Sequence, residues 1–119
     1  MNDRVLVCGG RNFTDADFLF RTLDDLRAKF GFTHVIHGQG QGADQLAYMW
    51  AVSRLGEVAV TGFPADWIRF NKSAGPRRNQ QMIDEGKPDF VIAFPGGKGT
   101  ADMVRRARRA NVPVIEVTY

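Results

Sequence analysis

The sequence has little cysteine and no long apolar run, and both absences restrict what the chain can be. Cys8 is the only cysteine among the 119 residues, so no internal disulfide can form. It follows the apolar residues 5–7, a position typical of a buried small hydrophobic side chain rather than a reactive thiol. No apolar stretch approaches the roughly 20 residues that a membrane-spanning helix requires.

Signals for export and for metal binding are also missing. Residues 1–4 lead into a strand-like run without the apolar segment and cleavage site of a signal peptide, so we expect a cytoplasmic protein. Histidine, cysteine and carboxylate residues do not recur at metal-ligand spacing, and no serine or cysteine nucleophile motif occurs. We therefore expect no metal site.

Length and composition indicate one globular domain over residues 1–119. The hydrophobic fraction is 44% and the charged fraction 24%, values that are ordinary for a domain with a single core. The net charge of +3 is mild. It is compatible with an anionic ligand or with weak nucleic-acid contact but requires neither, and a homo-oligomer also remains open.

Five short apolar runs alternate with segments of helical periodicity, which favours a parallel sheet with helices on both faces. Right-handed crossovers leave few topologies, and we expect the order 3-2-1-4-5. The predicted fold is a Rossmann-like three-layer α/β sandwich. Its five predicted strands cover residues 4–8, 33–37, 58–62, 89–94 and 114–118.

Four helices are predicted between these strands. Apolar residues recur at helical spacing from Phe18 to Phe30, where Thr14 and Asp17 resemble a capping box and Gly31 ends the pattern. The second helix, around Leu46 to Ala51, ends at Gly56, and the third follows Pro76 and includes Met82 and Ile83. The last covers residues 99–110, with Val104, Ala107 and Ala110 facing inward. The connection 63–75 is expected to be a functional loop.

Glycine is abundant, and its distribution predicts where a ligand binds. The chain has 13 glycines, many of them clustered at 9–10, 38–42 and 96–99. Each cluster follows a predicted strand, so all three should meet at the carboxyl edge of the sheet. With the expected strand order, the connections after the first and fourth strands diverge and open a crevice there.

These loops suit a phosphate group. Glycine lets backbone N–H groups converge on an anion, and the helix that begins near Gly99 adds unpaired donors and the positive end of its dipole. Thr100 adds a hydroxyl. The loop is not a Walker A motif, since Gly99 follows Lys98, and the first turn is not GxGxxG. The expected ligand-binding residues are Gly9, Gly10, Arg11, Gly38, Gly42, Ala43, Asp44, Lys72, Arg78, Asn79, Pro95, Gly96, Gly97, Lys98, Gly99 and Thr100.

Several polar side chains near the crevice allow two interpretations. Arg11 and Arg78 could bind phosphate bidentately, although Arg78 equally suits a solvated helix position. Asp44 could accept hydrogen bonds from ribose hydroxyls or simply favour the start of a helix. His37 ends a predicted strand, where a structural role is favoured over a catalytic one.

Two further groups also remain open. Trp67 and Phe70 could stack on a base, but packing in the core or in a lid is favoured. The basic cluster of the last helix should lie on its outer side, where a solvated face is favoured over nucleic-acid contact. That cluster consists of Arg105, Arg106, Arg108 and Arg109.

Five ordered motifs are spread across nearly the whole chain. They are Cys8-Gly9-Gly10-Arg11, His37-Gly38 with Gly42-Ala43-Asp44, Phe63-Pro64-Ala65-Asp66-Trp67, Gly75-Pro76-Arg77-Arg78-Asn79 with Met82, and Phe94-Pro95-Gly96-Gly97-Lys98-Gly99-Thr100. Together they resemble the SLOG superfamily, and in particular its small YpsA-related branch of phages and bacteria. The superfamily includes the Lonely Guy phosphoribohydrolases and the DNA-processing protein Smf/DprA. The resemblance implies a Rossmann-like fold and a site for nucleotides or nucleotide-derived signals.

One departure from the Lonely Guy pattern bears on catalysis. Those enzymes carry PGGxGTxxE, whose glutamate acts with an arginine on the N-glycosidic bond; Arg78 matches the arginine, but Met103 occupies the glutamate position. A thioether cannot act as a general base. Asp102 is adjacent but rotated by roughly 100° along a helix. The remaining catalytic candidates are Arg78, Asp44 and Asp66.

The sequence thus predicts a module that binds a nucleotide or an ADP-ribose-like phosphorylated ligand, as a sensor or signalling module. The first alternative is a nucleotide N-glycosidic hydrolase. A nucleic-acid-binding protein is less favoured.

Overall fold

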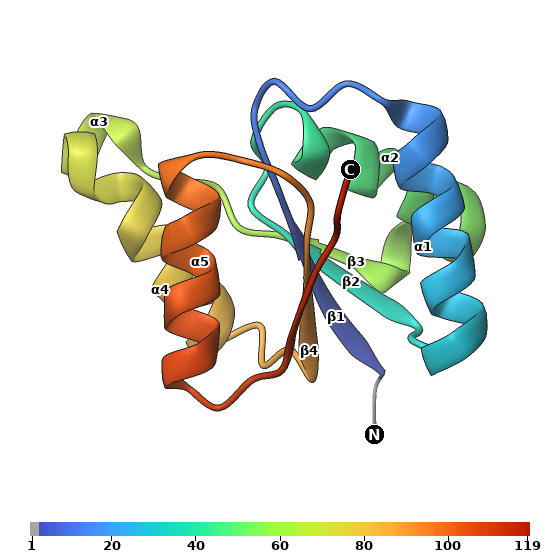
Figure 1. Cartoon of the computed structure of the whole chain (residues 1–119). Helices are drawn as coiled ribbons and strands as arrows, with labels where there is room; N and C mark the ends of the chain where they lie inside the picture. The colour runs from blue at the N-terminus through green and yellow to red at the C-terminus, as the bar shows by residue number, and fades with distance from the viewer. Residues whose placement is uncertain (1–2) are drawn as a thin grey trace.

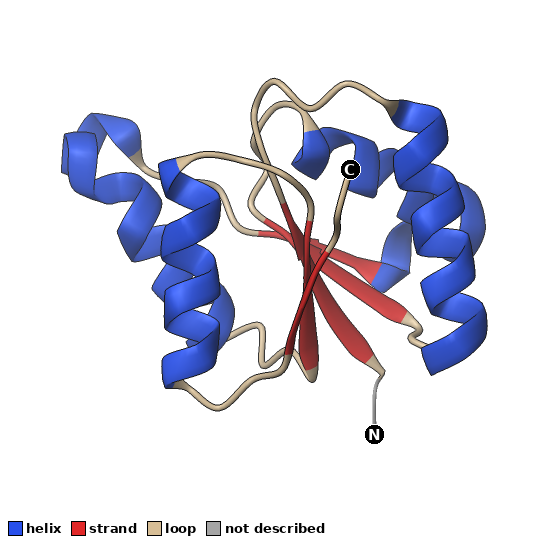
Figure 2. Cartoon of the chain, in the orientation of Figure 1, coloured by secondary structure: helices blue, strands red, loops and turns tan. Residues whose placement is uncertain are grey.

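The computed structural model describes residues 3–119 and contains one five-stranded sheet. All strand pairs are parallel and the order is β3-β2-β1-β4-β5, which confirms the predicted topology (Figures 1 and 2). The strands are β1 (Arg4–Cys8), β2 (His34–His37), β3 (Val60–Gly62), β4 (Phe90–Ala93) and β5 (Val114–Glu116).

Helices cover both faces of the sheet, as predicted. The helices α1 (Ala16–Phe30) and α2 (Ala43–Leu55) lie on one side, and α4 (Ala74–Asp84) and α5 (Lys98–Arg109) lie on the other (Figure 1). Side chains alternate between the two faces along β1. Val5 and Val7 therefore pack on the side of α1 and α2, and Leu6 and Cys8 pack on the side of α4 and α5. Cys8 is buried, as expected of a small hydrophobic residue. No helix of the described residues is long and apolar enough to cross a membrane.

The ends of α1 confirm one prediction and correct another. Gly31 ends the helix in the left-handed conformation, with φ 72°. The N-cap, however, is Asp15 and not Thr14, so the predicted capping box is wrong. The Asp15 carboxylate accepts a hydrogen bond from the Phe18 amide at 3.0 Å, and Asp17 lies inside the first turn. The helix therefore starts one residue later than the Thr14–Asp17 pattern suggested, and Asp15 caps the amide three residues after it.

Several other boundaries differ from the sequence prediction, and β2, β4 and β5 are each one or two residues shorter than predicted. Residues 57–59 form a short 3₁₀ turn, so β3 begins only at Val60, and Val58 is 95% exposed. At the end of α5, Val104 and Ala107 are buried as predicted, but Ala110 is exposed. The helix ends at Arg109, because the chain turns back there and the Val112 amide donates a hydrogen bond to the Ala107 carbonyl at 2.8 Å.

The connection 63–75 is not the irregular loop that the sequence suggested. It contains the short helix α3 (Trp67–Phe70) and the 3₁₀ turn η2 (Asn71–Ser73), and α4 already begins at Ala74. Asp66 starts α3, because its carboxylate accepts a hydrogen bond from the Arg69 amide at 3.1 Å. Pro76 lies in the first turn of α4, as predicted.

Candidate ligand-binding site

The loops that follow β1, β2 and β4 contact one another directly. The Gly10 amide donates to the Pro95 carbonyl at 2.9 Å, and the Ala43 amide donates to the Gly10 carbonyl at 3.1 Å. The segments around Gly10 and Gly96 are therefore adjacent, at the carboxyl edge of the sheet. This is where open α/β sheets bind ligands, at the point where the connections diverge.

Most glycines in these loops permit the loops to pack. A Cβ atom on Gly9 would lie 2.6 Å from the Ala43 side chain, and one on Gly96 would lie 2.7 Å from the Gly10 nitrogen. Gly42 has φ 70°, and a Cβ there would overlap the carbonyl oxygens of Gly10 and Arg11. These glycines join the loops to each other, and the Gly10 amide already has an acceptor.

Gly97 and Gly99 differ from this group. Beyond the adjacent residues and the backbone of α5 itself, a Cβ atom on either would meet no atom of the described residues within 4 Å, so neither glycine is required by packing against other elements. The first α5 backbone bond runs from the Ala101 amide to the Gly97 carbonyl at 3.0 Å. The amides of the preceding first-turn residues have no acceptor within the helix. The loop therefore presents open backbone donors at a helix N-terminus, which is a geometry suited to an anion.

Side chains around this helix start add a hydroxyl and positive charge. The Thr100 hydroxyl lies against Gly96, where an added Cβ would overlap it, so Thr100 is held at the loop. Lys98 and Arg11 are both exposed at the sheet edge. They can reach a ligand but make no contact with the protein that fixes them in a binding geometry.

Asp44 lies at the start of α2, beside the second loop. Its carboxylate accepts a hydrogen bond from the Gly40 amide at 3.1 Å. Burial raises the pKa of Asp44, against the opposing effects of the hydrogen bonds from the Gly40 and Gly38 amides and of the Arg78 charge. Asp44 is thus a desolvated carboxylate at the mouth of the site and not merely a solvated helix-start residue.

Arg78 enters the site from α4. Its guanidinium donates to the Gly38 carbonyl and, at 3.1 Å, to the Asn79 side-chain oxygen. Burial lowers the pKa of Arg78, while the nearby Asp44 charge raises it. Arg78 is therefore half-buried against the second loop, and the alternative of a solvated helix residue does not apply.

His37 has a structural contact at the end of β2. Its Nδ1 atom accepts a hydrogen bond from the Gln39 amide at 3.0 Å, and the ring is buried against Tyr48. Burial lowers the pKa of His37, and the Arg78 charge lowers it further, which favours the neutral ring. Beside it lies a polar depression of about 750 Å³, lined by His37, Gln39, Gly40, Gln41, Gln45, Tyr48, Glu57, Val60 and Gly62.

Asn79 joins α4 to α5. It is buried, and its side-chain nitrogen donates to the Gly99 carbonyl at 3.2 Å and to the Asp102 carboxylate at 3.0 Å. Asp102 also accepts from Arg106 at 2.8 Å. Burial acts to raise the pKa of Asp102, but the hydrogen bonds from Arg106 and Asn79 outweigh it and lower that pKa. Asp102 and Arg106 are four residues apart on one helix, a spacing that favours an ion pair, but the sequence analysis did not predict this pair.

Other candidate residues lie outside the cluster of Asp44, Arg78 and the glycine loops. Asp66 is exposed and caps α3, and Lys72 is exposed on η2. Met103 is 1% exposed and packs against Leu6 and Ile36 in the core, so no polar group replaces the glutamate at that position. Among residues 3–119, no group of three or more potential ligands suits a metal ion.

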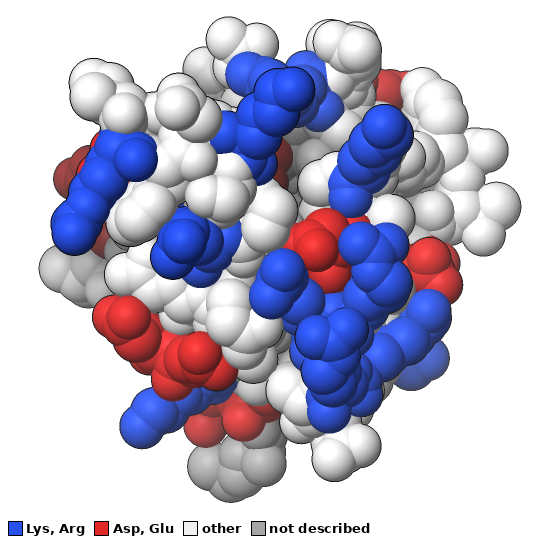
Figure 3. Space-filling view, turned by 90° about the vertical axis from the view of Figure 1, so that its left-hand side faces the viewer, with Lys and Arg blue, Asp and Glu red and all other residues white. Residues whose placement is uncertain are grey.

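The basic cluster of α5 is only partly on the outer side. Arg105, Arg108 and Arg109 are exposed, and Figure 3 shows basic side chains gathered over this side of the molecule. Arg106, however, turns toward α4, where it bonds Gln80 at 2.9 Å in addition to Asp102. The prediction that it faces outward is wrong, because the Asp102 carboxylate one turn earlier holds it inward.

The fold and the joined glycine loops together define a Rossmann-like domain of the SLOG type. A family model described as "YspA, cpYpsA-related SLOG family" matches residues 3–70, and the chain belongs to this family. The chain is also similar to the "Gene 61 protein" of Mycobacterium phage D29. The two are 38% identical, and the match covers 94% of each chain. The loop at 95–100 lies beyond the part that the family model matches.

Proposed function

We propose that the protein binds a nucleotide or a nucleotide-derived phosphorylated ligand, with its phosphate at the start of α5. The observation that carries this proposal is the open space above Gly97 and Gly99. Gly99 lies in the first turn of α5, and glycine in a helix is less favourable than alanine by about 1 kcal/mol. Gly97 is the N-cap that precedes it. Packing against other elements requires glycine at neither position. Close approach of a ligand to the backbone would explain why both residues are glycine.

The charge around the loop supports an anion. Lys98 and Thr100 belong to the first turn of α5, and the helix dipole adds to them. Arg11 extends from the adjacent first loop. We propose that Gly9, Gly10 and Gly96 instead hold the loops together, because neighbouring atoms occupy the space that a side chain at these positions would need.

Asp44 and Arg78 suit the sugar of such a ligand. The Asp44 carboxylate can accept hydrogen bonds from ribose hydroxyls. Such bonds are favourable because a charged acceptor that is removed from water needs donors. Arg78 offers the remaining guanidinium donors on the opposite side of the same loop. We propose that both residues contact the ligand between its phosphate and its base.

Calorimetry tests this function. AMP, ADP-ribose and a cyclic nucleotide are titrated into the protein, with adenosine as the ligand that lacks phosphate. At least one phosphorylated ligand should bind, and adenosine should bind much more weakly. A folded protein that binds none of them, or adenosine as tightly as AMP, contradicts the proposal.

A second function, hydrolysis of the N-glycosidic bond, is favoured by one observation. Asp44 is a partly buried carboxylate with a pKa raised by desolvation, near the Arg78 charge, and such shifts occur at sites of acid–base chemistry. The test is chromatography for free base after incubation with nucleoside monophosphates, with Asp44→Asn as the control variant. Base released by the wild type but not by the variant supports hydrolysis, and an unchanged substrate supports binding alone.

A further inference from the structure

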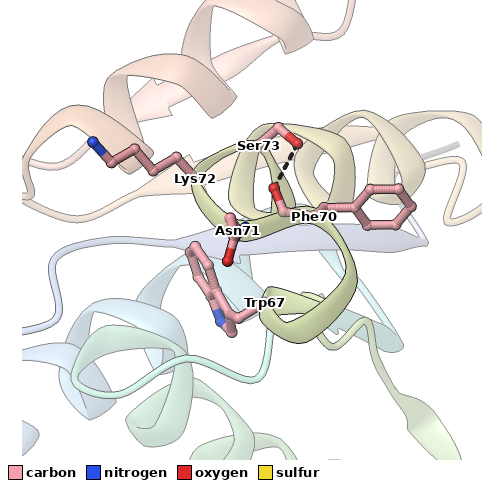
Figure 4. Close-up of a pocket in the computed structure, with 5 residues that line it drawn as sticks. All are labelled: Trp67, Phe70, Asn71, Lys72 and Ser73. Carbon is pink, nitrogen blue, oxygen red and sulfur yellow. Dashed lines mark hydrogen bonds between the residues drawn. The ribbon is translucent and has the colours of Figure 1, made fainter.

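Trp67 is an exposed aromatic residue next to the candidate site. It is 52% exposed, whereas Trp50 is fully buried. Trp67 lines a depression of about 690 Å³ together with Phe70, Asn71, Lys72 and Ser73 (Figure 4). Of the two packing roles expected for Trp67, in the core or in a lid, the first is therefore wrong, and its indole has surface available for another molecule.

Phe70 does not share this availability. The Arg77 guanidinium lies 4.3 Å from the centre of the Phe70 ring and that of Arg69 lies 5.1 Å from it. Figure 4 shows the Phe70 ring pointing away from the Trp67 indole. Cation–π contacts thus occupy Phe70, and the two aromatic residues do not form a sandwich.

A short path of contacts links Trp67 to the start of α5. The indole rests on the first turn of α4, because a Cβ on Gly75 would be 3.4 Å from its Cη2 atom. Asn79, four residues further along α4, bonds the Gly99 carbonyl. Four residues of helix rise by about 6 Å. The two contact positions on α4, Gly75 and Asn79, are therefore about one helical turn apart, a spacing that the ribose of a nucleotide can bridge.

On the basis of the proposed function, we infer that the Trp67 indole is the stacking platform for the base of the bound nucleotide. Stacking of a base on an aromatic side chain requires an accessible ring face and no particular base identity. The lining of this depression carries Lys72 and no carboxylate, so an anionic nucleotide is not repelled.

The polar depression beside His37 is the competing place for the base. It contains the Glu57 carboxylate, which accepts a hydrogen bond from the Tyr48 hydroxyl at 3.0 Å. The Tyr48 ring packs edge-on against His37, with 5.6 Å between ring centres. Its aromatic ring is therefore already engaged, and a carboxylate lies beside it, which favours the Trp67 side.

Calorimetry and tryptophan fluorescence test the inference. AMP and ribose 5-phosphate are titrated into the wild type, Trp67→Ala, Trp67→Phe and Gln45→Ala. AMP should quench wild-type fluorescence through Trp67, since Trp50 is inaccessible. Trp67→Ala should weaken AMP binding by roughly tenfold, and Trp67→Phe by much less. Neither variant should change the affinity for ribose 5-phosphate, and Gln45→Ala should bind AMP as the wild type does.

The outcomes separate the inference from the proposed function. AMP binding that is unaffected by Trp67→Ala, or weakened only by Gln45→Ala, overturns the inference and leaves the phosphate site standing. Equal loss of AMP and ribose 5-phosphate in a folded Trp67→Ala variant also overturns it, because that loss is independent of the base. If the wild type binds neither ligand, both proposals fail.

Discussion

The Asn79 side chain donates a hydrogen bond to the Gly99 carbonyl at 3.2 Å, and this contact ties α4 to the first turn of α5. The same nitrogen bonds Asp102, which in turn holds Arg106. The position of the open helix start thus depends on a buried amide in a neighbouring helix. Asn79 is therefore a positioning residue for the loop.

Asn79→Ala should destabilise the protein by about 1–3 kcal/mol, because it leaves the partly buried acceptors on Gly99 and Asp102 without this donor. The free energy of unfolding in urea at neutral pH measures the effect. Gln81→Ala is the matched control on the same helix, since Gln81 is exposed, and its cost should stay within about 0.5 kcal/mol. Equal stability of the two variants would mean that the Asn79 side chain contributes nothing to the packing of α4 against α5.

Gly42→Ala should destabilise the protein more than Gly31→Ala does. Both glycines have positive φ, of 70° and 72°. Only at Gly42 would the new Cβ also overlap backbone oxygens of the first loop, whereas at Gly31 it meets nothing within 4 Å. Strain at positive φ costs about 1–2 kcal/mol, and the overlap should add to it. Thermal unfolding of both variants measures the difference, and equal losses would show that the loops can separate without cost.

Asp44→Asn should change stability in a pH-dependent manner. Burial raises the pKa of Asp44 in the folded state, so its ionised form is the less stable one there. The wild type therefore loses stability as pH rises from the ordinary value of 3.8 through the raised folded pKa. The variant lacks this loss, so its stability relative to the wild type should grow across that range and then remain constant.

Asp24→Asn provides a control of opposite sign for that experiment. Hydrogen bonds from Arg54 and Trp50 lower the pKa of Asp24, so its ionised form stabilises the folded state above pH 3.8. This stabilisation disappears as pH falls through the lowered pKa. Urea unfolding between pH 3 and pH 7 should give opposite slopes for the two variants relative to the wild type. Parallel slopes would contradict the burial assigned to Asp44.

The topology and the loop positions were predictable because they follow from local signals. β-Branched runs alternate with amphipathic helices, and glycine clusters at 9–10, 38–42 and 96–99 mark the strand ends. The fine boundaries depend on contacts that a pattern does not contain. Asp15 and not Thr14 caps α1, and α3 forms within 63–75 where Asp66 caps it.

The roles of the individual glycines were not predictable. Gly10 and Gly99 look alike in the sequence, yet one is closed in by Pro95 and Gly96 while the other faces open space. The hydrogen bond from Asn79 to Asp102 was not predictable either, since it depends on how α4 packs against α5. Tertiary packing decides which of several similar residues remain free for a ligand.

Gly99→Ala tests the central claim most directly, through paired measurements of AMP affinity and thermal stability. The new methyl group meets no protein atom, so the melting temperature should be unchanged or higher, with a gain of up to about 1 kcal/mol. The same group should obstruct a phosphate at the helix start and weaken AMP binding by about tenfold or more, at least about 1.4 kcal/mol. A variant that binds AMP as tightly as the wild type would contradict the placement of the phosphate at α5.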